Sequence, residues 1–426
     1  MQNIPNIWRF KVFCDAAAAG SVSGAASRLG LTQPAASQAL AGLAEWCDAQ
    51  IFERKNNGLR LTAVGEKLLP RAQAAVALIE EGLRDTAGRD APLTPLLRAM
   101  SARRLESLIG IVRHGGFANA AKAEGYAAPT VHRSAKDLEK ALGAPLFETT
   151  SHGVRPTRQA ETLAVKAGLA FAEIAQGLAE VRRLSGREEG ATVIGAMPLA
   201  RAHLAPAAAA AFSAIHPEHR ISIVDGVYED LLIGLRRGEI DFLIGAIREN
   251  PSVKDIIEEP LFDDPLSIVM RAGHPALGAR RVSERHIERY PWVAPRATSP
   301  LRKRFDELFA FLGAAPPKDV IECNSLSAAR VLLMNSDRMM LLSDLQIAYE
   351  KSAGALASLP HPAGVVTRTI GLTMRRNWRP TEVQAELVGA VRAEAQRASF
   401  AKAQSSVPVL IRESADSMLE LKTVAT

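Results

Sequence analysis

Cysteine is scarce in this chain: only Cys14, Cys47 and Cys323 occur among 426 residues. None belongs to a CxxC pair and no histidine cluster is present, which argues against a disulfide framework and against a structural zinc site. A reducing cytoplasm fits this usage. Cys14 and Cys47 fall in segments of apolar periodicity, which favours buried helical thiols over a redox-sensing role.

Long hydrophobic runs and catalytic motifs are also lacking. No stretch of about 18 apolar residues could span a membrane, and the first ten residues lack the basic-then-apolar order of a signal peptide. We therefore expect a soluble, cytoplasmic protein with no membrane partner. The sequence has no phosphate loop, HExxH, GxSxG or pairing of a nucleophile with a base, so we expect no enzyme activity, no catalytic residues, no cofactor and no metal.

The composition is that of an ordinary globular protein. Hydrophobic residues make up 47% and charged residues 23%, and 426 residues need several domains. The net charge of +6 suits a polyanionic partner. An excess this small is also common in proteins that bind no nucleic acid, so charge alone decides nothing.

An internal repeat organises the first half of the chain. Shifting the sequence by 95 residues aligns two segments without a gap. Identical pairs include Gly20/Gly115, Ala25/Ala120, Ala26/Ala121, Gly30/Gly125, Pro34/Pro129, Leu43/Leu138, Phe52/Phe147, Gly58/Gly153, Arg60/Arg155, Thr62/Thr157 and Glu66/Glu161. Two copies of one small domain are the simplest explanation.

Each copy has the pattern of three helices. Residues 7–19 are Ala-rich and helical, and Ser23 is the expected cap of a second short helix. Gly30 and Leu31 form the turn. Thr32 is then the expected N-cap of a third helix, with Pro34 in its first turn, where proline costs little.

The third helix has one apolar and one polar face. Ala36, Leu40 and Leu43 follow helical spacing and point inwards, which leaves Gln33, Ser37 and Gln38 outside. A helix of this kind fits the major groove of DNA, where Gln can bond adenine and Ser can bond base edges or phosphate.

A two-stranded wing is expected next, over residues 51–61, with Asn57 and Gly58 at its tip. Arg54, Lys55 and Arg60 would supply phosphate contacts.

Residues 20–38, together with 51–54 and 61–65, strongly resemble the signature of LysR-type transcription regulators. The resemblance implies that Thr32, Gln33, Pro34, Ser37 and Gln38 lie at the DNA and that Arg54 reaches its backbone. The chain departs from the family pattern at 43–44 and 48–49, where Leu-Ala and Asp-Ala stand in place of the usual Leu-Glu and Leu-Gly. The geometry of the helix end is expected to differ slightly as a result.

The second copy, residues 101–164, resembles the family as well but has changed on its DNA side. Ala128, His132 and Thr149 stand where the first copy has Gln33, Ser37 and Arg54. Two interpretations stay open. A second DNA contact would use His132, Arg133 and Lys136; a degenerate copy would serve packing or dimerisation, which is slightly favoured because two expected contacts are missing.

The segment 63–86 reads as one long helix with an apolar stripe, and 158–184 is its counterpart in the second copy. In the resembled family this element is the dimerisation helix, so either or both could pair protomers. Residues 88–95, which begin with Gly88 and contain Pro92 and Pro95, break the chain between the copies.

In the second half, short β runs alternate with helices, a pattern that predicts an α/β domain with mainly parallel strands. Candidate strands are 191–196, 220–224, 240–245, 266–270, 320–323 and 339–342. Residues 238–245, 261–269 and 274–275 are similar to the family's effector domain, which implies a two-lobed, periplasmic-binding-protein-like architecture.

Ligands of open α/β sheets bind beyond the carboxyl ends of strands. That rule predicts an effector pocket lined by Met197, Pro198, Leu199, Ala246, Arg248, Thr298, Ser299, Asn324 and Ser325. Met197 and Leu199 stand where the family often has Ser or Thr, so a polar anchor is missing. Arg201, Arg248 or Arg296 could bind a carboxylate, although each is more often a solvated surface residue.

The resulting prediction is an α/β protein overall, with two copies of an all-α winged helix-turn-helix domain joined to the effector domain. The expected bounds are 1–65 (first winged helix), 66–97 (linker), 98–157 (second winged helix), 158–189 (second linker), 190–397 (effector domain) and 398–426 (flexible tail). The lobes of the effector domain are 190–268 plus 367–397, and 269–366.

The expected function is sequence-specific promoter binding modulated by a small-molecule effector. The partners are double-stranded DNA, that effector and further copies of the chain in a homodimer or homotetramer, and the resemblance also allows contact with RNA polymerase. The alternative is a solute-binding or architectural DNA-binding protein without ligand control.

Overall fold

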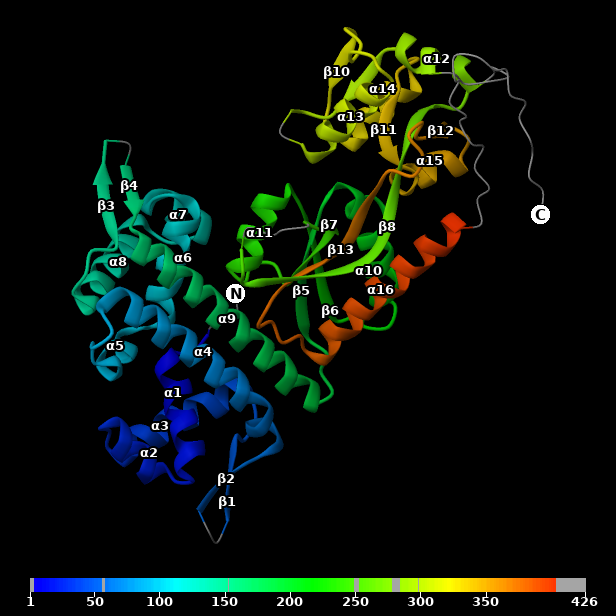
Figure 1. The fold of residues 1–426 in the computed structure, drawn as a ribbon. Helices are drawn as coiled ribbons and strands as arrows, with labels where there is room; N and C mark the ends of the chain where they lie inside the picture. The colour runs from blue at the N-terminus through cyan, green and yellow to red at the C-terminus, as the bar shows by residue number, and fades with distance from the viewer. Residues whose placement is uncertain are drawn as a thin grey trace.

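The structure is a computed structural model that describes residues 4–55, 58–151, 153–248, 253–277, 284–297 and 299–403. Figure 1 shows a helical N-terminal half and a C-terminal domain built on a curled sheet.

The first copy consists of α1 (Ile7–Ala19), α2 (Val22–Leu29), α3 (Gln33–Cys47) and the wing strands β1 (Phe52–Lys55) and β2 (Gly58–Leu61). The predicted helix 7–19, the cap Thr32 and the wing are confirmed. The predicted cap Ser23 is wrong: Ser21 has the extended backbone of an N-cap and accepts a hydrogen bond from the N–H of Gly24 at 3.1 Å. Ser23 lies inside the first turn of α2.

The second copy repeats this arrangement. It comprises α6 (Ala102–His114), α7 (Phe117–Glu124), α8 (Ala128–Leu142), β3 (Phe147–Thr150) and β4 (Gly153–Pro156), and the short helix α5 (Leu93–Ala99) precedes it. Its own apolar core is formed by Ile111, Ala120, Ala121, Val131 and Ala135. The second copy is therefore a complete winged module rather than a partial one.

The two long helices, α4 (Ala63–Ala87) and α9 (Arg158–Leu184), pack against each other within the chain. Their apolar stripes, with Leu68 and Ile79 on one helix and Leu163 and Ile174 on the other, belong to a single buried cluster that also contains the core of the first module. Figure 1 shows the two wings, β1–β2 and β3–β4, at opposite ends of this helix pair.

The C-terminal domain has a seven-stranded sheet in the order β11-β8-β13-β7-β5-β6, with β12 also paired to β8. Its strands are β5 (Gly190–Ala196), β6 (His219–Asp225), β7 (Phe242–Ala246), β8 (Ile256–Arg271), β11 (Met340–Ser343), β12 (Leu356–Pro360) and β13 (Thr367–Arg375). A separate parallel pair is formed by β9 (Trp292–Ala294) and β10 (Val320–Glu322).

The expectation of mainly parallel strands is wrong. In the described part of the large sheet, the parallel pairs are those of β5 with β6 and with β7, whereas β13 is antiparallel to β7 and β8, and β8 is antiparallel to β11 and β12. The prediction missed β9, β12, β13 and the first half of β8. Two of the antiparallel pairs involve β13, which returns the chain from residue 367 to the first lobe, and the other two join β8 to β11 and to β12.

Two sets of apolar clusters mark two lobes. One contains Ile194, Phe262 and Leu372, and the other, made of two neighbouring clusters, contains Ile268, Trp292 and Leu342. Figure 1 shows β8 and β13 running from one lobe to the other.

The helices of this domain flank the sheet. They are α10 (Ala205–Ser213), α11 (Tyr228–Arg236), α12 (Glu284–Arg289), α13 (Pro300–Phe311), α14 (Leu326–Met334), α15 (Ala348–Ser352) and α16 (Glu382–Ala403). The flexible tail predicted from residue 398 is wrong at its start, because α16 continues to Ala403; its remainder, 404–426, lies outside the described residues. Among the described helices, none is long and apolar enough to cross a membrane.

Candidate DNA-binding and effector-binding sites

Helix α3 presents a polar face to solvent. Gln33, Ser37 and Gln38 are exposed, as are Thr32 and Pro34 at the start of the helix. The opposite face, Ala36, Leu40 and Leu43, is buried in the module's core. The residues that pack the helix and the residues free to meet a partner are thus separated, as a groove-reading helix requires.

The wing is fixed next to this helix by a close backbone contact. The N–H of Leu59 donates to the carbonyl of Gly20 at 2.8 Å, and a Cβ at Gly58 would lie 2.7 Å from the same oxygen. Gly58 also has a φ of +118°, so the position requires glycine twice over. Arg54 and Arg60 are exposed on the two strands. Asn57 and the side chain of Lys55 lie outside the described part of the chain.

The corresponding face of α8 is exposed but chemically different. His132, Arg133 and Lys136 all face solvent. The His132 ring packs edge-on against Phe117 at 5.1 Å, and Lys136 pairs with Glu139 at 2.8 Å. Glu139 in turn accepts the backbone N–H groups of Leu146 and Phe147, which ties α8 to its wing.

In the first lobe, the predicted effector residues divide into buried and accessible ones. Met197 and Leu199 are buried in apolar clusters, so their side chains stabilise the lobe rather than line an open site. Pro198 is exposed, and Ala246 is half-buried at the end of β7. Arg248 stacks on the Tyr228 ring at 4.6 Å and pairs with Glu229 at 3.3 Å.

In the second lobe, the predicted residues lie at the carboxyl ends of two neighbouring strands. Ser299 caps α13 and Ser325 caps α14. Asn324 accepts the N–H of Arg296 at 2.9 Å, which joins the two loops that follow β9 and β10. Thr298 lies outside the described residues. The arrangement is the one in which α/β sheets place ligands.

The candidate arginines already have partners in two cases. Arg201 pairs with Asp225, and Arg248 pairs with Glu229. Both of these arginines are half-buried, while Arg296 is exposed.

The point where β8 and β13 pass between the lobes contains a buried ion pair that the sequence did not reveal. Asp264 is fully buried and accepts hydrogen bonds from the Ser343 hydroxyl at 2.6 Å and from the Arg368 guanidinium at 3.2 Å. Arg368 also donates to Gln346 at 2.9 Å. Burial lowers the pKa of Arg368, and the Asp264 carboxylate opposes that shift.

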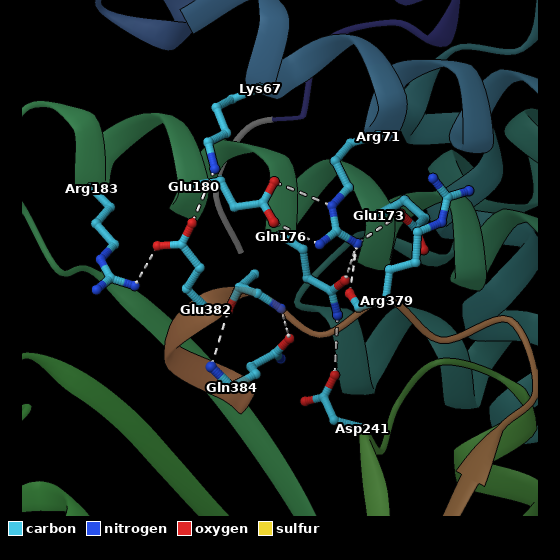
Figure 2. A network of polar contacts seen from close by, with 11 residues as sticks. Lys67, Arg71, Glu173, Gln176, Glu180, Arg183, Asp241, Arg379, Glu382 and Gln384 are labelled. Atoms are coloured by element: carbon cyan, nitrogen blue, oxygen red, sulfur yellow. Dashed lines mark hydrogen bonds and ion pairs between the residues drawn. The ribbon is translucent and has the colours of Figure 1, made fainter. Parts of the chain in front are cut away.

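A second polar network joins the helix pair to the effector domain (Figure 2). Its centre is Arg71, whose side chain is 5% exposed and which donates to Glu180 on α9 at 2.7 Å and to the carbonyl of Arg379 at 2.8 Å. Glu173, at 3.0 Å, and Gln176, at 2.9 Å, complete its shell. Burial opposes the charge of Arg71, but these carboxylates raise its pKa overall.

The same junction continues on both sides of Arg71. Gln176 donates to the buried Asp241 at 3.3 Å, and burial raises the pKa of that carboxyl. Lys67 and Arg183 both pair with Glu382 at the start of α16. Farther along, Arg113 of the second module pairs with Glu239 at 2.8 Å. The effector domain therefore contacts the long helices and the second module through charged groups.

Family models recognise three parts of the chain. The model described as bacterial regulatory helix-turn-helix protein, lysR family, matches residues 7–66 and again 102–161, and the LysR substrate binding domain model matches 185–396. The two helix-turn-helix matches are 95 residues apart, as the repeat predicts.

Curated relatives and a solved structure are similar to this chain over most of its length. The HTH-type transcriptional regulator GalR of Pseudomonas putida is 33% identical over 389 residues, which cover 91% of this chain and 97% of that protein. The regulator PcaQ of Agrobacterium fabrum is 27% identical and covers 68% of this chain and 93% of that protein. A full-length OxyR variant from Pseudomonas aeruginosa matches with a TM-score of 0.51 and 21% identity, covering 70% of this chain and 95% of that chain.

The chain therefore belongs to the LysR family of transcriptional regulators. It is a DNA-binding regulator with an effector-binding domain, which confirms the predicted family, fold class and function. The alignment with GalR leaves 9% of this chain uncovered, which is fewer residues than either matched helix-turn-helix module contains, so the alignment includes at least part of both modules.

Proposed function

We propose that the exposed face of α3 reads base edges in the major groove, with Gln33, Ser37 and Gln38 as its readers. Thr32 and Pro34 lie at the end of the helix that approaches the phosphates. The wing residues Arg54, Lys55 and Arg60 hold the DNA backbone. The observation that carries this proposal is the division of α3 into a buried apolar face and an unobstructed polar face.

The effector binds between the lobes, against Ser299, Asn324 and Ser325 on one side and Pro198, Ala246 and Arg248 on the other. Closure pivots on β8 and β13, next to the Asp264–Arg368 pair. The movement of β13 reaches the long helices at the junction around Arg71. Arg379 lies in the loop between β13 and α16, and its carbonyl accepts a hydrogen bond from Arg71 on α4. Such control requires the effector to bind the two lobe arrangements with different affinity.

The domain bounds proposed are those expected from the sequence, except that the last helix extends to Ala403. As a regulator of transcription the protein acts in the cytoplasm, as a homo-oligomer, without catalysing a reaction.

Selection of DNA from a random library tests this proposal. The full chain should enrich a defined sequence, and the variant Gln33→Ala/Arg54→Ala should lose that enrichment. The matched variant Gln73→Ala/Arg89→Ala removes the same two residue types from exposed positions outside α3 and the wing, and should keep it. Equal enrichment by all three proteins would exclude the first module as the reader.

A further inference from the structure

The contacts between α4 and α9 are reciprocal. A Cβ at Gly82 would meet Leu163 and Lys166, and a Cβ at Gly177 would meet Leu68 and Arg71. These residues are related by the repeat: adding 95 to 82, 68 and 71 gives 177, 163 and 166. Each contact from α4 to α9 is therefore matched by a second contact in which the two residues are replaced by their counterparts in the other copy.

The polar contacts follow the same rule. Lys166 pairs with Glu81 at 2.7 Å, and the counterpart of Lys166, Arg71, bonds Gln176, which is the counterpart of Glu81. The centre of the pairing falls at Ala75 and its counterpart Ala170, both fully buried. Reciprocal contacts of this kind define an isologous interface, which normally joins two identical subunits about a two-fold axis.

We infer that one chain of this protein is itself a two-headed DNA-binding unit, a pseudo-dimer whose two recognition helices, α3 and α8, differ and read a non-palindromic site. The inference rests on the proposed function of α3. The helices that would pair two protomers already pair with each other, so a second chain has no free copy of this interface to occupy.

The points at which the two modules join the helix pair lie about one turn of DNA apart. The pairing is antiparallel, so the modules attach at opposite ends of it, as Figure 1 shows. The starts of α4 and α9 are separated by about 25 residues along the pair, or roughly 38 Å at about 1.5 Å per residue. Half-sites read by paired recognition helices lie about 34–36 Å apart, one turn of B-DNA.

The two heads present different chemistry. Ser37 and Gln38 of α3 correspond to His132 and Arg133 of α8, and all four are exposed. Gln pairs best with adenine, whereas Arg donates two hydrogen bonds to guanine. A palindrome offers the same bases to both heads, so the preferred site has two dissimilar halves.

Engineered cysteines test the pairing. In a background without Cys14, Cys47 and Cys323, the pair Gly82→Cys/Lys166→Cys places two Cβ atoms about 3.3 Å apart, close to disulfide geometry. Oxidation of the full-length chain should give a cross-linked monomer at every protein concentration. A covalent dimer, or no disulfide at all, would overturn the inference; each single variant controls for adventitious bonds.

Selection from random DNA then tests the readout with symmetry-matched variants. The wild type should enrich a motif with dissimilar halves, Ser37→Ala/Gln38→Ala should relax one half, and His132→Ala/Arg133→Ala the other. A palindromic motif affected only by the first pair would contradict a second reading head. Failure of the wild type to enrich any sequence would instead refute the proposed function, whatever the cysteine pair shows.

Discussion

Replacing Arg71 by Ala should loosen the helix pair far more than the same change at its counterpart, Lys166. Arg71 is 5% exposed and holds Glu173 and Glu180, which are themselves 14% and 19% exposed. Removing one partner of a buried ion cluster leaves the others uncompensated and costs about 3 kcal/mol, the low end of the range for buried pairs because the glutamates retain some solvent.

Lys166 occupies the equivalent place in a different environment. Its side chain is 22% exposed and it pairs with Glu81, which is 55% exposed. An ion pair of this kind contributes about 1 kcal/mol or less. Alanine is the best helix former at both positions, so helix propensity does not explain a difference between the variants.

Hydrogen exchange of the full chain measures the effect where it occurs, on peptides from α4 and α9. Arg71→Ala should lower amide protection there by about 100-fold, which corresponds to about 3 kcal/mol. Lys166→Ala should lower it less than about fivefold. Equal losses in the two variants, or a loss below about fivefold for Arg71→Ala, would refute the argument that burial of this cluster decides its contribution.

Three further predictions concern other parts of the molecule. His216 is buried, which opposes its protonation, but Glu188 at 2.8 Å and Glu386 at 2.7 Å raise its pKa overall. The protonated ring therefore stabilises the fold fully below the ordinary histidine pKa near 6.5, and this contribution is lost as pH rises through the raised pKa of the folded state. His216→Gln should accordingly flatten the dependence of the melting temperature on pH above about 6.5. Burial raises the pKa of the Cys14 and Cys47 thiols to about 12. Mass spectrometry after brief alkylation of the native protein at about pH 7.5 should therefore find Cys323 modified first. Faster labelling of Cys14 or Cys47 would count against their burial. Arg54→Ala should reduce the slope of log affinity against log salt by about 1, as measured by anisotropy titrations at several salt concentrations, whereas an unchanged slope would remove Arg54 from the phosphate contacts.

Local features of the fold could be predicted from the sequence. Gly30 and Thr32 act through hydrogen bonds and backbone angles within a few residues, so the end of α2 and the start of α3 follow closely from residue type. The first module's exposed face was predicted for the same reason. The choice of Ser23 over Ser21 as a cap failed because both serines satisfy the residue preference and only the backbone at Ser21 is extended.

Features that depend on distant partners could not be predicted. Strand β13 pairs with strands more than 100 residues earlier, and Arg71 meets Glu173 and Glu180 across a similar separation. Met197 and Leu199 follow a strand as pocket residues do, yet the packing of the lobe buries them. The repeat was visible in the sequence, but the pairing of its two long helices within one chain required the structure.

Titration of the selected DNA site with wild-type protein, Gln33→Ala/Arg54→Ala and Gln73→Ala/Arg89→Ala tests most directly whether the polar face of α3 and its wing read DNA. Loss of one bidentate base contact costs about 1–3 kcal/mol, so the account predicts that the first variant binds at least about fivefold more weakly. The second variant should bind within about twofold of the wild type. Equal affinity of all three proteins for the site would contradict the account.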